Sequence, residues 1–214
     1  MHLYLIRHGE SLVNIPVESG RSHDDLDLGL TENGQIQAKA VASWMKQQVP
    51  QINALYASPM RRAGETAQFL ADAYQFQIVF DDRLREIGNN RIDHSPLPKD
   101  ELPREYSSLS PFRFPYSPVA PAVEKSESFM HYRVRIGMFL EDLINRHQGE
   151  TVIVVGHGGT LNAVTDTIFN IGSYRQCDIR GSYTGVTLFQ YMGKPDWEMW
   201  RLHFLSRVDH LVSV

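Results

Sequence analysis

The sequence is poor in three features: cysteine, long apolar runs and surplus positive charge. Cys177 is the only cysteine, so the chain can form neither an internal disulfide nor the thiolate cage of a structural zinc site. Lys and Arg number 21 against 25 Asp and Glu, and the net charge of −4 argues against nucleic acid or an anionic membrane as partner. The apolar run at 152–155 is far shorter than the roughly 20 residues of a membrane-spanning helix. We therefore expect a cytoplasmic protein, because a reducing compartment suits one cysteine.

Histidine, by contrast, is abundant in an otherwise ordinary globular composition. Of the 214 residues, 42% are hydrophobic and 21% are charged, which is typical of a folded protein with a buried core. No repeat or flexible linker divides the chain, so we expect a single domain over residues 1–214. The nine histidines are enough to build either a metal site or an acid–base site.

Hydrophobic periodicity predicts strands that alternate with helices. The expected strands lie at 2–6, 54–57, 77–80, 151–155, 186–191 and 197–205. The expected helices start at Thr31 as N-cap, at Ser58 as N-cap with Pro59 in the first helical position, near Ser126 and at Gly158. Strands separated by helices pair in parallel through right-handed crossovers. The predicted fold class is α/β, a three-layer α/β/α sandwich with a mostly parallel central sheet.

One segment breaks this alternation. Residues 88–125 contain seven of the eleven prolines together with several aromatic residues, so they cannot form a central strand or a long helix. Long irregular segments inside a compact domain often serve as covers of a functional site. We expect an insertion at about 88–125 that acts as a lid.

Three expected strands end in polar residues. Arg7-His8 follows the first strand, Arg61-Arg62 lies just after the second, and His157 follows the fourth. In open α/β sheets, ligands bind where the strands end at their carboxyl edge. The helix that opens at Gly158 adds free N–H groups that favour an anion. The sequence therefore predicts a phosphate pocket that contains an imidazole.

Five motifs in a fixed order carry a resemblance over most of the chain. They are Arg7-His8-Gly9-Glu10-Ser11 with Asn14, Asp27-Leu-Gly-Leu30-Thr31 with Gly34, Ser58-Pro59-Met60-Arg61-Arg62-Ala63 with Thr66-Ala67, Leu84-Arg85-Glu86, and His157-Gly158-Gly159. This set resembles the histidine phosphatase superfamily, which includes the cofactor-dependent phosphoglycerate mutases. The resemblance implies a phosphoglycerate mutase-like fold and a phosphomonoester hydrolase of the histidine acid phosphatase type.

The resemblance also implies a role for each motif residue. His8 would be the nucleophile and form a phosphohistidine intermediate, while Arg7, Arg62, His157 and Asn14 would contact the transferring oxygens. Glu86 would act as proton donor and then as base, and Glu10 would support the pocket. Ser11, Gly158 and Thr184 are further candidates for binding a small phosphorylated substrate.

Three alternatives remain open. A mutase-type phosphotransferase should have surplus positive charge in its lid, whereas residues 88–125 carry five basic and five acidic residues, which favours a phosphatase. A metal hydrolase would place histidines close together, but the sequence has no His-x-His or His-x-x-x-His pair, so we expect no metal and no cofactor. A non-catalytic phosphate-binding module usually lacks one of the chemical groups, and here all are present. The oligomeric state is left open, with a dimer as one option.

Overall fold

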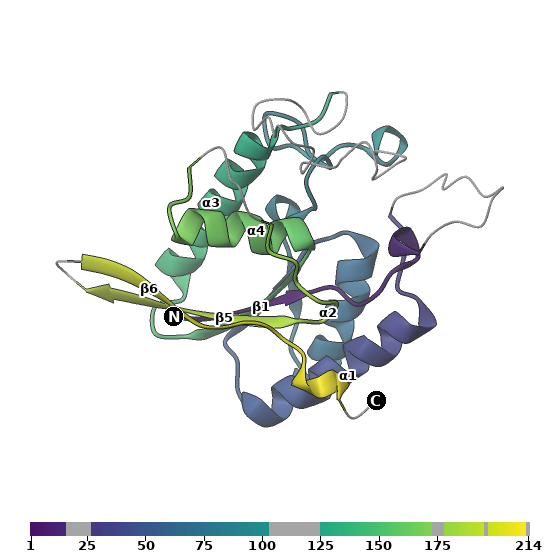
Figure 1. Cartoon of the computed structure of the whole chain (residues 1–214), viewed down its shortest axis with the longest axis vertical. Helices are drawn as coiled ribbons and strands as arrows, with labels where there is room; N and C mark the ends of the chain where they lie inside the picture. The colour runs from purple at the N-terminus through teal and green to yellow at the C-terminus, as the bar shows by residue number, and fades with distance from the viewer. Residues whose placement is uncertain (16–26, 103–124, 173–177, 195–196, 213–214) are drawn as a thin grey trace.

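The computed structural model describes residues 1–15, 27–102, 125–172, 178–194 and 197–212. Its centre is a six-stranded sheet with the order β3-β2-β4-β1-β5-β6 (Figure 1). The strands are β1 (His2–Arg7), β2 (Ala54–Ala57), β3 (Ile78–Phe80), β4 (Thr151–Gly156), β5 (Val186–Lys194) and β6 (Trp197–Arg207). The pairs β3–β2, β2–β4 and β4–β1 are parallel, and β5 and β6 add antiparallel pairs at one edge.

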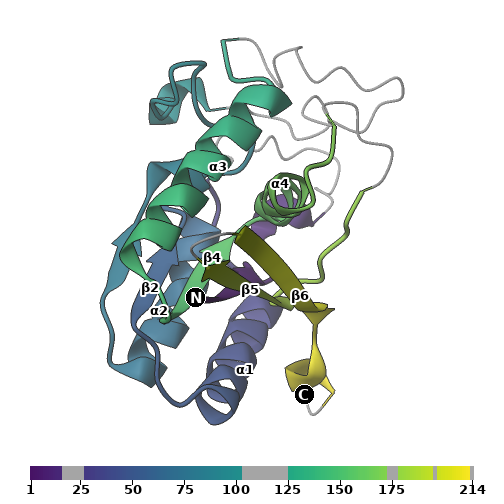
Figure 2. The same ribbon diagram turned by 90° about the vertical axis from the view of Figure 1, so that its left-hand side faces the viewer.

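Two helices cover each face of the sheet (Figure 2). The helices α1 (Glu32–Gln48) and α2 (Arg61–Tyr74) pack on one face, and α3 (Phe129–Arg146) and α4 (Gly158–Ile168) pack on the other. Strand β4 shows why, because Val152 and Val154 contribute to the core beneath α3 and α4, while Ile153 and Val155 contribute to the opposite core. Both faces are apolar, so both need a helical layer. The predicted three-layer α/β/α sandwich is confirmed.

The start of one helix was predicted correctly and the start of another was not. The Thr31 hydroxyl accepts the N–H of Gly34 and caps α1 as expected. Helix α2 begins at Arg61 with Met60 as its N-cap residue, so the prediction that Ser58 caps it is wrong. The Ser58 hydroxyl instead lies 2.8 Å from Nε2 of His157, a contact that local sequence rules do not contain.

The described part of the predicted lid consists of residues 88–102 and Lys125. Asn90 and Pro96 form an isolated antiparallel bridge, and Lys99–Glu101 form a short 3-10 helix. Residues 103–124 of the predicted lid lie outside the described residues. Within the part of the chain that the structure describes, none of the helices is both long and apolar enough to span a bilayer.

Candidate active site

His8 lies at the carboxyl edge of the sheet, directly after β1, and is buried. Its Nδ1 is 2.7 Å from the carbonyl oxygen of Gly9, so Nδ1 carries the proton and Nε2 carries the lone pair. Arg62 Nε donates to that Nε2 at 3.2 Å. Burial, followed by the positive charges of Arg62 and Arg7, holds the pKa of His8 well below its ordinary value. The imidazole is therefore neutral near pH 7 and presents a nucleophilic nitrogen.

The two arginines beside His8 are fixed in different ways. Arg62 is buried in the first turn of α2, which turns its guanidinium toward His8. Arg7 donates from Nη1 to the carbonyl oxygen of Gly181 at 2.6 Å, and its guanidinium lies 4.3 Å from the ring centroid of Tyr183. Among the described residues, the buried Arg7 Nε has no hydrogen-bond partner. Arg7 can bind a phosphate oxygen while it keeps its contacts with Gly181 and Tyr183, and Arg62 can do so once it releases His8 Nε2.

His157 completes the group at the N-terminus of α4. Its ring centroid is 5.2 Å from that of His8, and its Nε2 lies 2.8 Å from the Ser58 hydroxyl. Burial and then the charge of Arg62 hold the pKa of His157 well below its ordinary value. Its buried Nδ1 has no partner within the described chain. A neutral imidazole with one anchored nitrogen can donate from the other to a phosphoryl oxygen.

Glu86 approaches the same helix end from the opposite side. Its carboxylate accepts the N–H of Ile87 at 2.9 Å, the N–H of Gly159 at 3.2 Å and the Tyr132 hydroxyl at 3.4 Å. A Cβ on Gly159 would lie 2.0 Å from Glu86 Oε1, so glycine is required for this approach. The helix N-terminus thus holds a carboxyl group beside the phosphate-binding cations.

Three of the predicted substrate-binding residues belong to the segments that follow β1 and β4. Gly158 is the first residue of α4, and a Cβ there would lie 3.9 Å from Arg7 Nε. Ser11 is buried and donates to Asn14 Oδ1 at 2.7 Å, while Asn14 itself is exposed. The Ser11 hydroxyl is therefore directed to Asn14, which lies at the outer side of the loop after β1.

Thr184, another predicted substrate-binding residue, is buried in the turn before β5. Its hydroxyl donates to the carbonyl oxygen of Tyr183 and lies 2.8 Å from His210 Nε2, which uses its hydrogen-bonding capacity inside the protein. Its backbone N–H donates to the carbonyl oxygen of Arg7 at 3.0 Å. The neighbouring Tyr183 lies beside His8, with 6.1 Å between their ring centroids.

Sequence reasoning missed Ser58 and Tyr183 as site residues. Ser58 belongs to a motif that was quoted, so its hydroxyl could have been considered as a partner for a catalytic histidine. Tyr183 is adjacent to the predicted residue, and an aromatic side chain near a predicted phosphate pocket is a plausible cover for an arginine. Neither signal identifies the partner, because His157 is 99 residues from Ser58 in the chain.

Glu10 supports the site from the side of α1, in keeping with its expected role. Thr31 donates to Glu10 Oε1 at 2.7 Å, and the backbone N–H of Glu10 donates to Gln37 Oε1 at 2.9 Å. A Cβ on Gly34 would lie 1.9 Å from the carbonyl oxygen of Glu10, so the loop after His8 rests directly on the first turn of α1.

The described residues offer anion-binding groups at this site, and their carboxylates and histidines are scattered. They include no cluster of three or more His, Cys, Asp or Glu side chains that could hold a metal ion. His8 and His157 face arginines, which suit an anion and repel a cation. The site as described is therefore suited to phosphate.

Comparison with known proteins also points to phosphate chemistry. The family model of the histidine phosphatase superfamily (branch 1) matches residues 3–203. A putative phosphoserine phosphatase 2 of Hydrogenobacter thermophilus is 30% identical, over 97% of this chain and 96% of that protein. A probable phosphoglycerate mutase GpmB of an Enterobacter species is 26% identical, over 99% of this chain and 95% of its own.

Solved structures share the fold. A protein described as mycobacterial hydrolase 1 has a TM-score of 0.73 at 21% identity, with 97% of this chain and 99% of that chain covered. YhfR of Bacillus stearothermophilus has a TM-score of 0.71 at 25% identity, with 98% of both chains covered. The fold of the chain is thus shared with these solved structures.

Proposed function

The chain belongs to the histidine phosphatase superfamily, and from that membership we propose that it is a phosphomonoester hydrolase that works through a phosphohistidine on His8. The observation that carries the proposal is the state of His8: Nδ1 is tied to Gly9, Nε2 accepts a hydrogen bond from Arg62, and the His157 ring centroid lies 5.2 Å from its own. Phosphoryl transfer needs a neutral nucleophile and positive charge around the transferred oxygens, and these residues supply both.

In the first step, Nε2 of His8 attacks phosphorus and the bond from phosphorus to the ester oxygen breaks. Arg7, Arg62 and His157 stabilise the three equatorial oxygens, whose charge develops in the transition state. The departing alkoxide needs a proton, and Glu86 is the carboxyl group at this edge of the pocket. The products of the step are an alcohol and phospho-His8, with Glu86 left as a carboxylate.

In the second step, water attacks the phosphorus of phospho-His8. The Glu86 carboxylate takes a proton from that water, which restores the acid, and the bond from nitrogen to phosphorus breaks to release inorganic phosphate. The arginines serve the same oxygens in both steps. This two-step scheme is that of a histidine acid phosphatase-type enzyme and needs no resident cofactor.

We propose a small phosphate ester as the substrate. Phosphoserine and 3-phosphoglycerate are the first to test, because curated relatives are described as a putative phosphoserine phosphatase and probable phosphoglycerate mutases. The balanced charge of residues 88–125 supports hydrolysis over mutase activity. A lid formed by residues 88–125 over the site, within one domain of a cytoplasmic protein, remains a prediction.

Chemical trapping of the intermediate tests the proposal. Enzyme incubated with phosphate-labelled substrate and quenched in detergent at alkaline pH is expected to carry a base-stable, acid-labile label on His8, and His8→Ala is expected to lose both label and turnover. His203→Ala is the matched control, because this histidine is exposed on β6 and its Nε2 lies 2.9 Å from Gln190 Oε1. Full hydrolysis by His8→Ala would refute the nucleophile.

The same preparations separate the alternatives. A mutase would interconvert phosphoglycerates when primed with bisphosphoglycerate, and a non-catalytic module would bind phosphate without acquiring a label. Turnover in the presence of a strong chelator is expected to stay unchanged. Complete loss of turnover with the chelator would favour a metal hydrolase over the scheme proposed here.

A further inference from the structure

A buried ion pair lies behind Glu86. The side chains of Glu127 and Arg135 are both fully buried, and they face each other in a bidentate arrangement. Arg135 Nε donates to Glu127 Oε2 at 2.7 Å, and Nη2 donates to Oε1 at 2.5 Å. Glu127 immediately precedes the Ser128 cap of α3, and Arg135 lies two turns further along that helix.

The remaining hydrogen bonds of the pair go to the main chain around Glu86. Arg135 donates to the carbonyl oxygens of Arg83 and Glu86, the latter at 3.3 Å. Glu127 Oε1 accepts the N–H of Gly88 at 3.1 Å. Peptide groups before, at and after Glu86 are therefore held by one ion pair.

The same helix also reaches the carboxyl group itself. Tyr132 is one turn before Arg135, and its hydroxyl donates to Glu86 Oε1 at 3.4 Å. The Arg135 guanidinium lies 4.4 Å from the centroid of the Tyr132 ring, so both side chains act as one packed unit. Glu86 is thus fixed by α3 through its backbone and through its side chain.

Stability alone gives no reason to bury these charges. Well-packed apolar side chains of similar volume can replace a buried ion pair without loss of stability, because desolvation of the charges offsets their attraction. The pair differs from an apolar replacement in what it bonds, namely the peptide groups of residues 83–88. An apolar pair would make none of these hydrogen bonds and would not hold the Glu86 segment in place.

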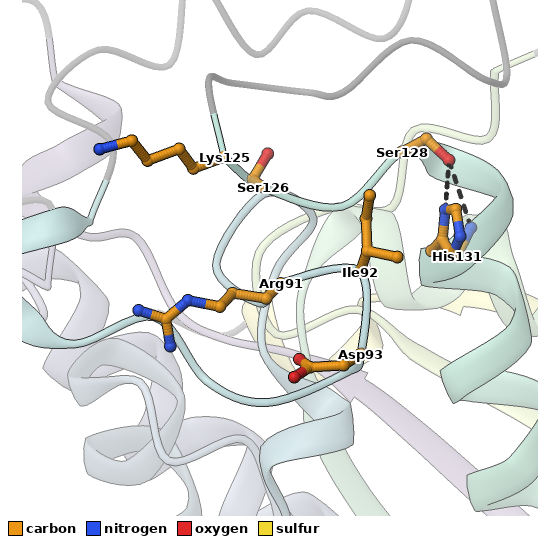
Figure 3. Close-up of a pocket in the computed structure, with 7 residues that line it drawn as sticks. All are labelled: Arg91, Ile92, Asp93, Lys125, Ser126, Ser128 and His131. Atoms are coloured by element: carbon orange, nitrogen blue, oxygen red, sulfur yellow. Dashed lines mark hydrogen bonds between the residues drawn. The ribbon is translucent and has the colours of Figure 1, made fainter.

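The pair also joins the two ends of the predicted lid. The backbone N–H of Glu127 donates to the carbonyl oxygen of Asn90 at 2.9 Å. Ser126 and Ser128, which flank Glu127, line a hollow of about 480 Å³ together with Arg91 and Lys125 (Figure 3). The wall of this hollow is therefore continuous with the ion pair, whose other side supports Glu86.

We propose that Glu127 and Arg135 are positioning residues that hold Glu86 where it can protonate the leaving oxygen. The inference rests on the proposed function, since it assumes that Glu86 is the acid. It assigns to the pair a specific effect on esters with poor leaving groups. The alkoxide that departs from an alkyl phosphate such as phosphoserine needs a proton, whereas p-nitrophenyl phosphate releases a phenolate that is stable without one.

The test compares both substrates in the double variant Glu127→Leu, Arg135→Met, in Arg135→Lys and in Glu86→Gln. A misplacement of the acid by about 1 Å is expected to lower kcat/KM for phosphoserine by about 10²-fold, with less than about threefold loss for p-nitrophenyl phosphate. We compare kcat/KM because it ends at departure of the leaving group and excludes hydrolysis of phospho-His8, in which Glu86 is the base for both substrates. Arg135→Lys keeps the charge but not the forked geometry, so an intermediate loss is expected. Arg146→Met is the control, because it removes an exposed arginine from the other end of α3.

Failure of the inference and failure of the proposed function are distinguishable. If Glu86→Gln lowers kcat/KM by the same factor for both substrates, Glu86 is not the acid and the proposed mechanism fails. If Glu86→Gln discriminates between the substrates but the pair variants lower both equally, the pair is only structural and the inference fails. If the double variant does not fold, Arg135→Lys decides between the outcomes. A change by the same factor for both substrates, relative to wild type, overturns the inference.

Discussion

Replacement of Gly159 by alanine would displace Glu86 without removing any chemical group. The new Cβ would lie 2.0 Å from Glu86 Oε1 and 3.1 Å from the Tyr132 hydroxyl oxygen. A carbon and an oxygen atom approach to roughly 3.3 Å, so the carboxylate must move by more than about 1 Å. The atom that must move is the end of a flexible side chain, and alanine suits a helix better than glycine. We therefore expect a folded protein with a misplaced acid.

The expected cost is specific to the step that uses the proton. A displacement of this size lowers kcat/KM for phosphoserine by about 10²-fold, while kcat/KM for p-nitrophenyl phosphate changes by a few-fold at most. The assay is steady-state hydrolysis of both substrates, together with thermal unfolding. Gly137→Ala is the matched control, because its Cβ would make only an ordinary contact, 3.9 Å from a Thr167 methyl group. Equal activity of Gly159→Ala and wild type on phosphoserine would refute the assigned position of Glu86.

Three further predictions concern the imidazoles and their neighbours. The folded state holds the pKa of His8 and His157 below the unfolded value of about 6.5, so the free energy of unfolding should fall as pH drops below 6.5, by up to roughly 1.4 kcal/mol per pH unit for each histidine. Urea unfolding at several pH values should show a shallower dependence of this free energy on pH for His8→Gln, and an unchanged dependence would contradict the prediction. Ser58→Ala removes a hydrogen bond worth about 1 kcal/mol from His157 and should lower kcat/KM about fivefold; unaltered kinetics would exclude that contact from catalysis. Arg62→Ala should lower kcat by about 10²-fold or more, whereas Arg61→Ala should leave kcat nearly unchanged, because Arg61 is exposed and pairs with Glu65 of the same helix. Similar losses of kcat in both variants would mean that the pocket arginine is misassigned.

The sequence predicted the layers and the convergence of the catalytic groups because both follow local signals. Apolar runs mark the strands, and each of His8, Arg62 and His157 follows directly or closely after such a run. Once the strands pair in parallel, their carboxyl ends meet at one edge. His8 and His157 accordingly lie with ring centroids 5.2 Å apart, although 149 positions separate them (157 − 8 = 149).

Contacts that depend on distant partners could not be predicted in this way. The Ser-Pro pattern at 58–59 indicates a helix cap, yet the hydroxyl is engaged by a histidine 99 residues away. Thr184 is buried in a turn where its φ is +53°, and its hydroxyl lies 2.8 Å from Nε2 of His210, 26 residues further along the chain. Arg135 gave a readable signal, since it lies one turn from Tyr132 on an otherwise apolar helix face, but its partner Glu127 precedes the helix.

The position of β1 between β4 and β5 has a consequence for biosynthesis. Strand β1, which ends directly before His8, is made first, whereas its partner strands β4 and β5 begin at Thr151 and Val186. A growing chain on the ribosome therefore holds His8 without the strands that flank it for most of translation. Contacts of such sequence separation form slowly because a long loop must close first. Enzymatic activity of this protein is consequently a late event in folding, and its appearance would report completion of the sheet.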